Sequence, residues 1–202
     1  DGWRRQPTQA EKKVNFDGIQ KKLNSLEAEC ERTIKPIYNQ LITGALIKID
    51  KYVQAGQYDK ITSKNIFDEN LKNQYIKVLK ESGLDAYTYG KNDASDEIKV
   101  AIPTTPKESK AFFQDNAISV VEKQLSDLTF KIQAEVSKAR RKDQLSKFSA
   151  SDIISALNIM TGLYYQDTVG LTASVLVSIG INRGRKDVFD VAKEKIYAYQ
   201  YS

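Results

Sequence analysis

Three carboxylates near the C-terminal end, Asp187, Asp190 and Glu194, are the side chains whose spacing could support chemistry. Residues three and four apart share one face of a helix, so the three could bind a divalent cation or exchange protons with a substrate. A basic residue also stands four positions before each aspartate, Arg183 and Lys186. Helical ion pairs on a solvated face explain the same spacing without any ligand, and we favour this second interpretation.

The composition excludes several kinds of active site. The 202 residues contain no histidine and a single cysteine, Cys30. A Ser-His-Asp triad, a Cys-His dyad and a zinc site of cysteines and histidines are therefore impossible within these residues. No Gly-x-Gly-x-x-Gly and no Gly-Lys-Ser/Thr phosphate loop occurs either. We expect no catalytic residue, no metal and no cofactor, and we place Cys30 in the core as a small apolar residue.

Basic residues exceed acidic ones by 31 to 26, which gives a net charge of +5. They cluster beside Trp3, over residues 138–147 and over residues 183–186. Such clusters are typical of nucleic-acid contacts when they gather on one surface. The candidates are Arg140, Arg141, Lys142, Arg183, Arg185 and Lys186. The middle cluster also lies where a helix should end, and cations are favoured there without any ligand.

Apolar periodicity and capping signals indicate the elements that carry these residues. We expect helices over residues 8–56, 63–82, 106–142, 149–164 and 169–199. Pro36 predicts a kink or short break in the first helix near Thr33, and Gly56 is expected to end it. The Thr105-Pro106-Lys107-Glu108 segment is typical of a helix start. Gly180 and Gly184 place small residues on one helix face, where another helix backbone could approach closely.

These patterns predict a mainly α protein of long amphipathic helices in a bundle-like arrangement. The expected organisation is an N-terminal arm (1–7), a helical part (8–83), an irregular loop or linker (84–105) and a second helical part (106–202). At most a short strand or hairpin is expected, at Lys99–Ile102. The longest uncharged run, 168–182, is too short to span a bilayer, so we expect no membrane partner.

A stretch of the last helix carries a family resemblance. The segment 172–189, with Asn182, Gly184 and Arg185 in an Asn-x-Gly-Arg arrangement, resembles the C-terminal region of phage minor head proteins of the Mu F-type head morphogenesis family. The ending Tyr199-Gln-Tyr-Ser202 resembles the approach to the Cys-x-x-Cys motif of that family. Members are sometimes joined to portal proteins. Since the first residue is not methionine, we expect a processed product or part of a longer protein.

The resemblance implies a structural minor capsid protein in the head of a tailed phage, made in the host cytoplasm and acting in head assembly, DNA packaging or DNA ejection. Its implied partners are the portal protein, the major capsid protein or both, further copies of itself, and optionally packaged double-stranded DNA. It implies no enzymatic activity. Two alternatives from other classes stay open: a basic helical nucleic-acid-binding module, and a catalytic domain that uses the three carboxylates with a divalent metal.

Overall fold

The computed structural model describes residues 9–98, 101, 103–143 and 150–200. Its elements are α1 (Gln9–Gln54), η2 (Tyr58–Lys60), α2 (Ser63–Ile66), α3 (Glu69–Ile98), α4 (Lys107–Asp143) and α5 (Ala150–Gln200). No strand occurs in these ranges, so the prediction of a mainly α protein is confirmed. The N-terminal arm and the strand candidate, apart from Ala101, lie outside the described residues.

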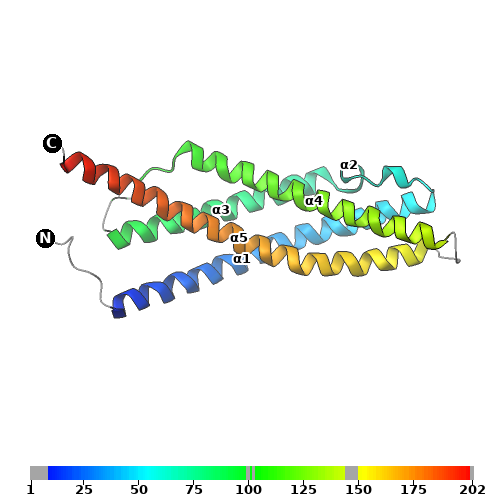
Figure 1. Ribbon diagram of the computed structural model, residues 1–202, viewed down its shortest axis with the longest axis horizontal. Helices are drawn as coiled ribbons and strands as arrows, with labels where there is room; N and C mark the ends of the chain where they lie inside the picture. The colour runs from blue at the N-terminus through cyan, green and yellow to red at the C-terminus, as the bar shows by residue number, and fades with distance from the viewer. Residues whose placement is uncertain (1–8, 99–100, 102, 144–149, 201–202) are drawn as a thin grey trace.

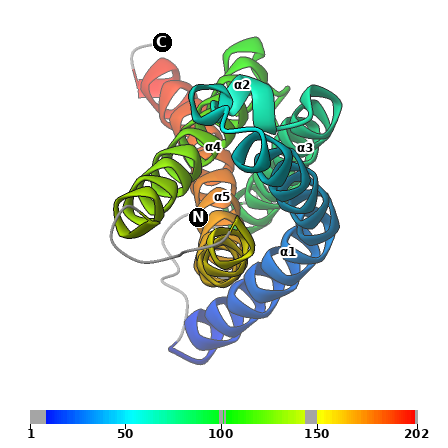
Figure 2. The same cartoon turned by 90° about the vertical axis from the view of Figure 1, so that its right-hand side faces the viewer.

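Four long helices lie side by side in an elongated bundle and alternate in direction (Figure 1). In that view α1 and α4 run from left to right, and α3 and α5 return from right to left. In the end view α5 lies between α4 and α1 (Figure 2), and it packs against α3 as well. Buried apolar residues of all four helices form one core, so helices from both expected helical parts pack together.

The expected apolar stripes face this core. On α1 the buried members are Cys30, Ile34, Leu41, Ala45, Ile49 and Val53. On α4 they are Val121, Leu125, Leu128, Ile132, Val136 and Ala139. Tyr38 of α1 and Tyr75 of α3 add an edge-to-face aromatic contact, with ring centroids 5.8 Å apart. The burial of Cys30 confirms its predicted place in the core.

The helix α1 ends in the glycine cap that the sequence predicts. Gly56 adopts φ +67°, a left-handed conformation that glycine accepts without strain. Its amide donates to the carbonyl oxygen of Val53 at 3.1 Å, and the Gln57 amide donates to the carbonyl oxygen of Tyr52 at 2.8 Å. These two bonds are a Schellman motif, which satisfies carbonyls at the end of the helix.

No break occurs at Pro36, because α1 is one uninterrupted helix from Gln9 to Gln54. The prediction of a short break near Thr33 is therefore wrong. A proline deprives the carbonyl four residues earlier of its amide donor, here that of Arg32. Both Pro36 and Arg32 are exposed, so water can hydrogen-bond to that carbonyl and the helix continues.

A helix begins at Ser63 as expected, but the helix expected over 63–82 is interrupted after Ile66 and ends later than residue 82. The chain breaks after α2, and α3 starts afresh where Asp68 Oδ1 accepts a hydrogen bond from the Leu71 amide at 3.0 Å. The helix then runs through Gly83 to Ile98. Residues 84–98 of the expected loop (84–105) are helix, and Tyr87 and Gly90 in this stretch pack against the backbone of α5.

The two helices expected over 149–164 and 169–199 are one, α5. The threonines of this stretch bond within the helix: Thr161 Oγ1 donates to the Leu157 carbonyl at 2.8 Å and Thr172 Oγ1 to the Thr168 carbonyl at 2.7 Å. Val169 is buried in the core. Its packing outweighs the weak helix propensity of the surrounding Thr and Gly residues.

Candidate functional site

The helices α3 and α5 cross in close contact at the glycines of both helices. A Cβ on Gly180 would lie 2.7 Å from the Ala86 Cβ and 2.7 Å from the Gly83 carbonyl oxygen. A Cβ on Gly90 would overlap the backbone of Ile181, with its Cα at 2.8 Å. The two backbones are therefore in direct contact, as the small-residue face of α5 predicted.

The residues that carry the family resemblance lie at or beside this crossing. Gly184 packs against the backbone of Tyr87 and Lys91. Arg185 forms ion pairs with Asp93 and, at 2.5 Å, with Glu97, both on α3. Asn182 is exposed. Two of these three residues therefore hold α5 against α3.

A polar cluster joins α3, α4 and α5 next to the crossing. The Tyr87 hydroxyl donates to Asp187 Oδ2 at 2.7 Å, and the Ser109 hydroxyl donates to the same oxygen at 3.0 Å. Arg183 Nε donates to Ser109 Oγ at 3.3 Å, and its guanidinium lies over the Phe112 ring, 4.1 Å from the centroid. Burial and the hydrogen bond to Asp187 raise the pKa of Tyr87 to about 12.

Lys91 is a second buried polar residue of this region, with 5% of its surface exposed. Its Nζ donates to Thr105 Oγ1 at 3.0 Å, next to the start of α4. The same ammonium lies 5.5 Å from the centroid of the Tyr87 ring. Desolvation by burial lowers the pKa of Lys91. Its hydrogen bond ties α3 to the start of α4.

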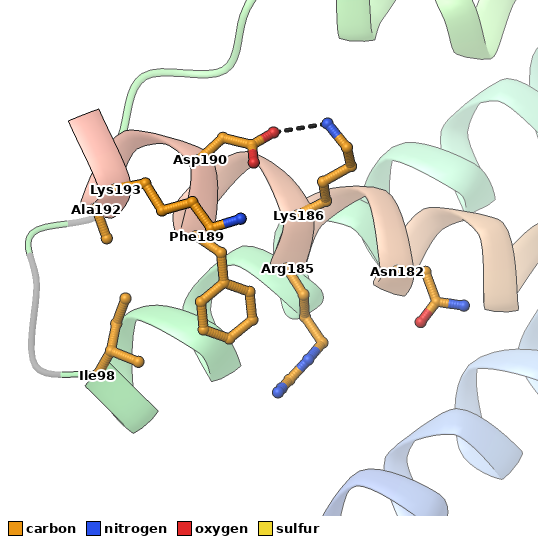
Figure 3. A pocket seen from close by; sticks show the side chains of 8 residues that line it. All are labelled: Ile98, Asn182, Arg185, Lys186, Phe189, Asp190, Ala192 and Lys193. Atoms are coloured by element: carbon orange, nitrogen blue, oxygen red, sulfur yellow. Dashed lines mark hydrogen bonds and ion pairs between the residues drawn. The ribbon is translucent and has the colours of Figure 1, made fainter. Parts of the chain in front are cut away.

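The expected carboxylate face does not form a joint site. Asp187 points into the polar cluster, whereas Asp190 pairs with Lys186 at 2.6 Å (Figure 3). The Glu194 side chain lies outside the described residues. Among the described residues no group of three or more His, Cys, Asp or Glu side chains could hold a metal ion. The predicted helical ion pair is present at Lys186, while Arg183 contacts Ser109 instead.

A shallow pocket of about 600 Å³ lies between the end of α3 and the C-terminal part of α5 (Figure 3). Its lining includes Ile98, Phe189, Lys193 and the Lys186–Asp190 pair. The hydrogen bond between that pair raises the pKa of Lys186 and lowers that of Asp190. Because Lys186 and Asp190 are paired with each other, and Asp190 is the only carboxylate in the lining, the pocket offers no converging acid and base.

The basic candidates do not lie together, and Lys186 is exposed and paired with Asp190 on its own helix. Arg183 and Arg185 contact other helices of the bundle, as described above. Arg140 and Arg141, near the end of α4, are exposed. The Arg140 guanidinium lies over the Tyr58 ring at 4.2 Å from the centroid. The Lys142 side chain lies outside the described residues, so the structure places two of the six candidates together on an accessible surface.

The sequence patterns above do not predict the apolar side chains that α5 exposes. These are Ile159, Leu163, Leu171 and Val175, which are 67%, 61%, 66% and 49% exposed; we call them the outer face of α5. Leu171 and Val175 also line a groove of about 490 Å³ between α4 and α5. The available signal was that α5 is apolar on more than one side, which favours burial against a partner.

Comparisons with protein-family models, with curated proteins and with solved structures find no match for this chain. Within the described ranges, none of the helices combines the length and apolar character that crossing a membrane requires.

Proposed function

We propose that this chain is a structural minor head protein of a tailed phage, not an enzyme, which is made in the host cytoplasm and incorporated into the virion. In this proposal the outer face of α5 binds the portal protein, the major capsid protein or both. The phage assignment depends on the resemblance at Asn182, Gly184 and Arg185. The binding mode depends on the geometry of α5.

The observation that carries the binding mode is the exposure of four large apolar side chains on the longest helix. Fully burying one such side chain contributes about 1.5–3 kcal/mol. Covering the exposed parts of all four would therefore contribute about 5 kcal/mol before the costs of association. Exposed apolar patches of this kind mark interaction surfaces on folded proteins.

The test is capture of head proteins. The chain is co-expressed with the portal protein and the major capsid protein of the phage that encodes it, and bound proteins are measured after affinity purification. We expect the wild-type chain to retain one of them and the double variant Leu163→Ser/Leu171→Ser to lose it. The matched control is Phe130→Ser, because Phe130 is 71% exposed on α4 outside this face. Capture that the double variant leaves unchanged would contradict the proposal.

Nucleic-acid binding is the second candidate function, supported by the exposed arginines at the end of α4. The Arg140–Tyr58 stack joins a cation to an aromatic ring, a combination suited to phosphates and bases. We expect DNA affinity that falls with salt and drops in the variant Arg140→Ala/Arg141→Ala/Lys142→Ala. The control is Lys77→Ala, a change at an exposed lysine on α3. Binding that is absent or insensitive to salt would exclude this function.

A further inference from the structure

A seam lies between α4 and the segment that connects α1 to α3, residues 57–66 (Figure 1). Two hydrogen bonds, of 2.7 and 2.6 Å, and one cation–ring contact of 4.2 Å to the centroid fix its course, in the pairs Ser63–Thr129, Ile61–Gln133 and Tyr58–Arg140. The two chains therefore run antiparallel along the seam. From Thr129 to Arg140, α4 extends for about 16 Å, a length that several consecutive phosphates of a nucleic-acid strand cover.

Basic side chains follow one another along this seam. Lys60 and Lys64 belong to the connecting segment, and Arg140 and Arg141 belong to α4; all four are exposed. None of the four forms an ion pair with another residue in the described part of the chain. Asp59 is the one acidic residue between positions 57 and 66. The seam therefore presents an excess of positive charge to solvent.

Helix ends explain only part of this charge. Cations are favoured within the last turn of a helix, and Arg140 and Arg141 lie within the last turn of α4. Lys60 and Lys64 do not belong to a long helix, because η2 has three residues and α2 has four. Their position beside the arginines therefore calls for an anionic partner and not for capping.

An exposed aromatic ring stands beside these cations. Phe130 is 71% exposed and follows Thr129, whose hydroxyl group contacts Ser63 across the seam. Eleven residues make about three helical turns, so Phe130 and Arg141 lie on the same side of α4. A ring among cations is the combination by which proteins hold single strands, since the cations contact phosphates and the ring stacks on an unpaired base.

The ring also discriminates between anionic partners. An acidic peptide offers charge to the lysines and arginines and nothing that stacks on Phe130. A duplex offers phosphates, but its bases are already stacked on one another within the helix. A single strand satisfies both the cations and the ring, because its bases are free to turn outward.

We propose that this seam binds a single-stranded nucleic acid, with its phosphates on Lys60, Lys64, Arg140 and Arg141 and one base stacked on Phe130. This inference rests on the nucleic-acid function proposed above, the second candidate. It adds the form of the nucleic acid and three residues outside the basic cluster of α4.

Fluorescence anisotropy of the whole chain with a labelled oligothymidylate of about 12 nucleotides measures this binding. A duplex of the same length and polyglutamate of equal charge serve as competitors. We expect the oligothymidylate to bind more tightly than the duplex, with an affinity that falls between about 50 and 200 mM salt. Absence of binding would overturn the proposal, and so would a duplex or polyglutamate that competes as well as unlabelled oligothymidylate.

Substitutions separate the ring from the charges. Phe130→Leu keeps an apolar side chain without a ring and should weaken binding about ten-fold, whereas Phe130→Tyr should retain it. Leu163→Ala, a change at an exposed apolar residue of α5, is the control. If Phe130→Leu binds as the wild type does, no base stacks on the ring and the proposal is overturned.

The lysines are tested through the salt dependence. Lys60→Ala/Lys64→Ala should reduce the slope of log affinity against log salt by about 1.4, since two phosphate contacts with a single strand are lost. Lys21→Ala/Lys22→Ala, at two exposed lysines of α1, is the matched control. A slope that changes equally in both double variants would overturn the proposal, because only net charge would then matter.

The two nucleic-acid proposals fail separately. If duplex and single strand bind equally, and Arg140→Ala/Arg141→Ala/Lys142→Ala weakens both, the single-strand inference is overturned and the second candidate function stands. If no oligonucleotide binds, both are excluded. Capture of head proteins by the outer face of α5 is a separate measurement, because the seam lies on other elements of the fold.

Discussion

Replacing Gly184 by alanine adds one methyl group where α5 touches α3. The added Cβ would overlap the carbonyl oxygen of Tyr87 and lie 2.9 Å from the Lys91 amide nitrogen. Both are backbone atoms, so neither can turn aside as a side chain would, and the helices must separate. Overpacking of this kind costs about 1–3 kcal/mol, and we place Gly184→Ala at the upper end because two backbones must move.

Part of this cost is offset, because alanine favours a helix by about 1 kcal/mol over glycine. We therefore expect the free energy of unfolding to fall by about 2 kcal/mol. For a chain of this size the melting temperature should fall by about 4–8 °C. Urea unfolding followed by far-UV circular dichroism measures the change, with the slope of the transition checked for each variant.

The matched control is Gly44→Ala, on α1. A Cβ at Gly44 would meet nothing within 4 Å, so only the helix propensity changes. We expect this variant to be more stable than wild type by up to about 1 kcal/mol. If Gly184→Ala unfolds at the same urea concentration as Gly44→Ala, the two helices are not in backbone contact and the reasoning is refuted.

Three further predictions concern side chains. The pKa of Tyr87 is raised to about 12 in the folded state, so the unfolded state loses this proton first. The free energy of unfolding should therefore fall as the pH rises from about 10 to 12. In urea titrations, Tyr87→Phe should flatten this fall. Arg185→Gln leaves the Asp93 carboxylate, whose side chain is 10% exposed, without its partner. It should lower the unfolding free energy by about 2 kcal/mol, whereas Lys186→Gln, in an exposed pair, should change melting little. Burial also raises the pKa of the Cys30 thiol, so a thiol reagent should modify it slowly in the folded chain and quickly in urea; equal rates would contradict its place in the core.

Local signals along the chain predicted much of the fold. The three- and four-residue spacing of apolar side chains identified the buried stripes of α1 and α4, because that spacing follows directly from helical geometry. Gly56 was recognisable as a helix end, since a left-handed residue there needs no neighbour to explain it. The start of α4 at Lys107, directly after Pro106, agrees with the expected helix start.

Tertiary contacts determined the parts of the fold that local signals did not predict. Gly83, Tyr87 and Gly90 have the composition of a turn, and they are helical because α5 packs on their backbone. The sequence indicated this contact only on α5, through its small residues. The residues of α3 that contact them were assigned to a loop. The exposed apolar residues of α5 were missed because they are separated by steps of four or eight residues, and every four residues turn about 40° around the helix. Such a stripe winds around the helix and does not give the three- and four-residue alternation that marks one buried or exposed side.

The contact between α3 and α5 also determines how the bundle carries mechanical load. At about 1.5 Å per residue, α5 is about 76 Å long, and the glycine crossing lies toward its C-terminal end. A pull on that end is transmitted as shear directly from one backbone to the other, before any flexible side chain can yield. The ion pairs of Arg185 with Asp93 and Glu97 of α3 also oppose sliding of α5 along α3. We therefore expect α3 and α5 to move together as one rigid unit when force is applied to either helix.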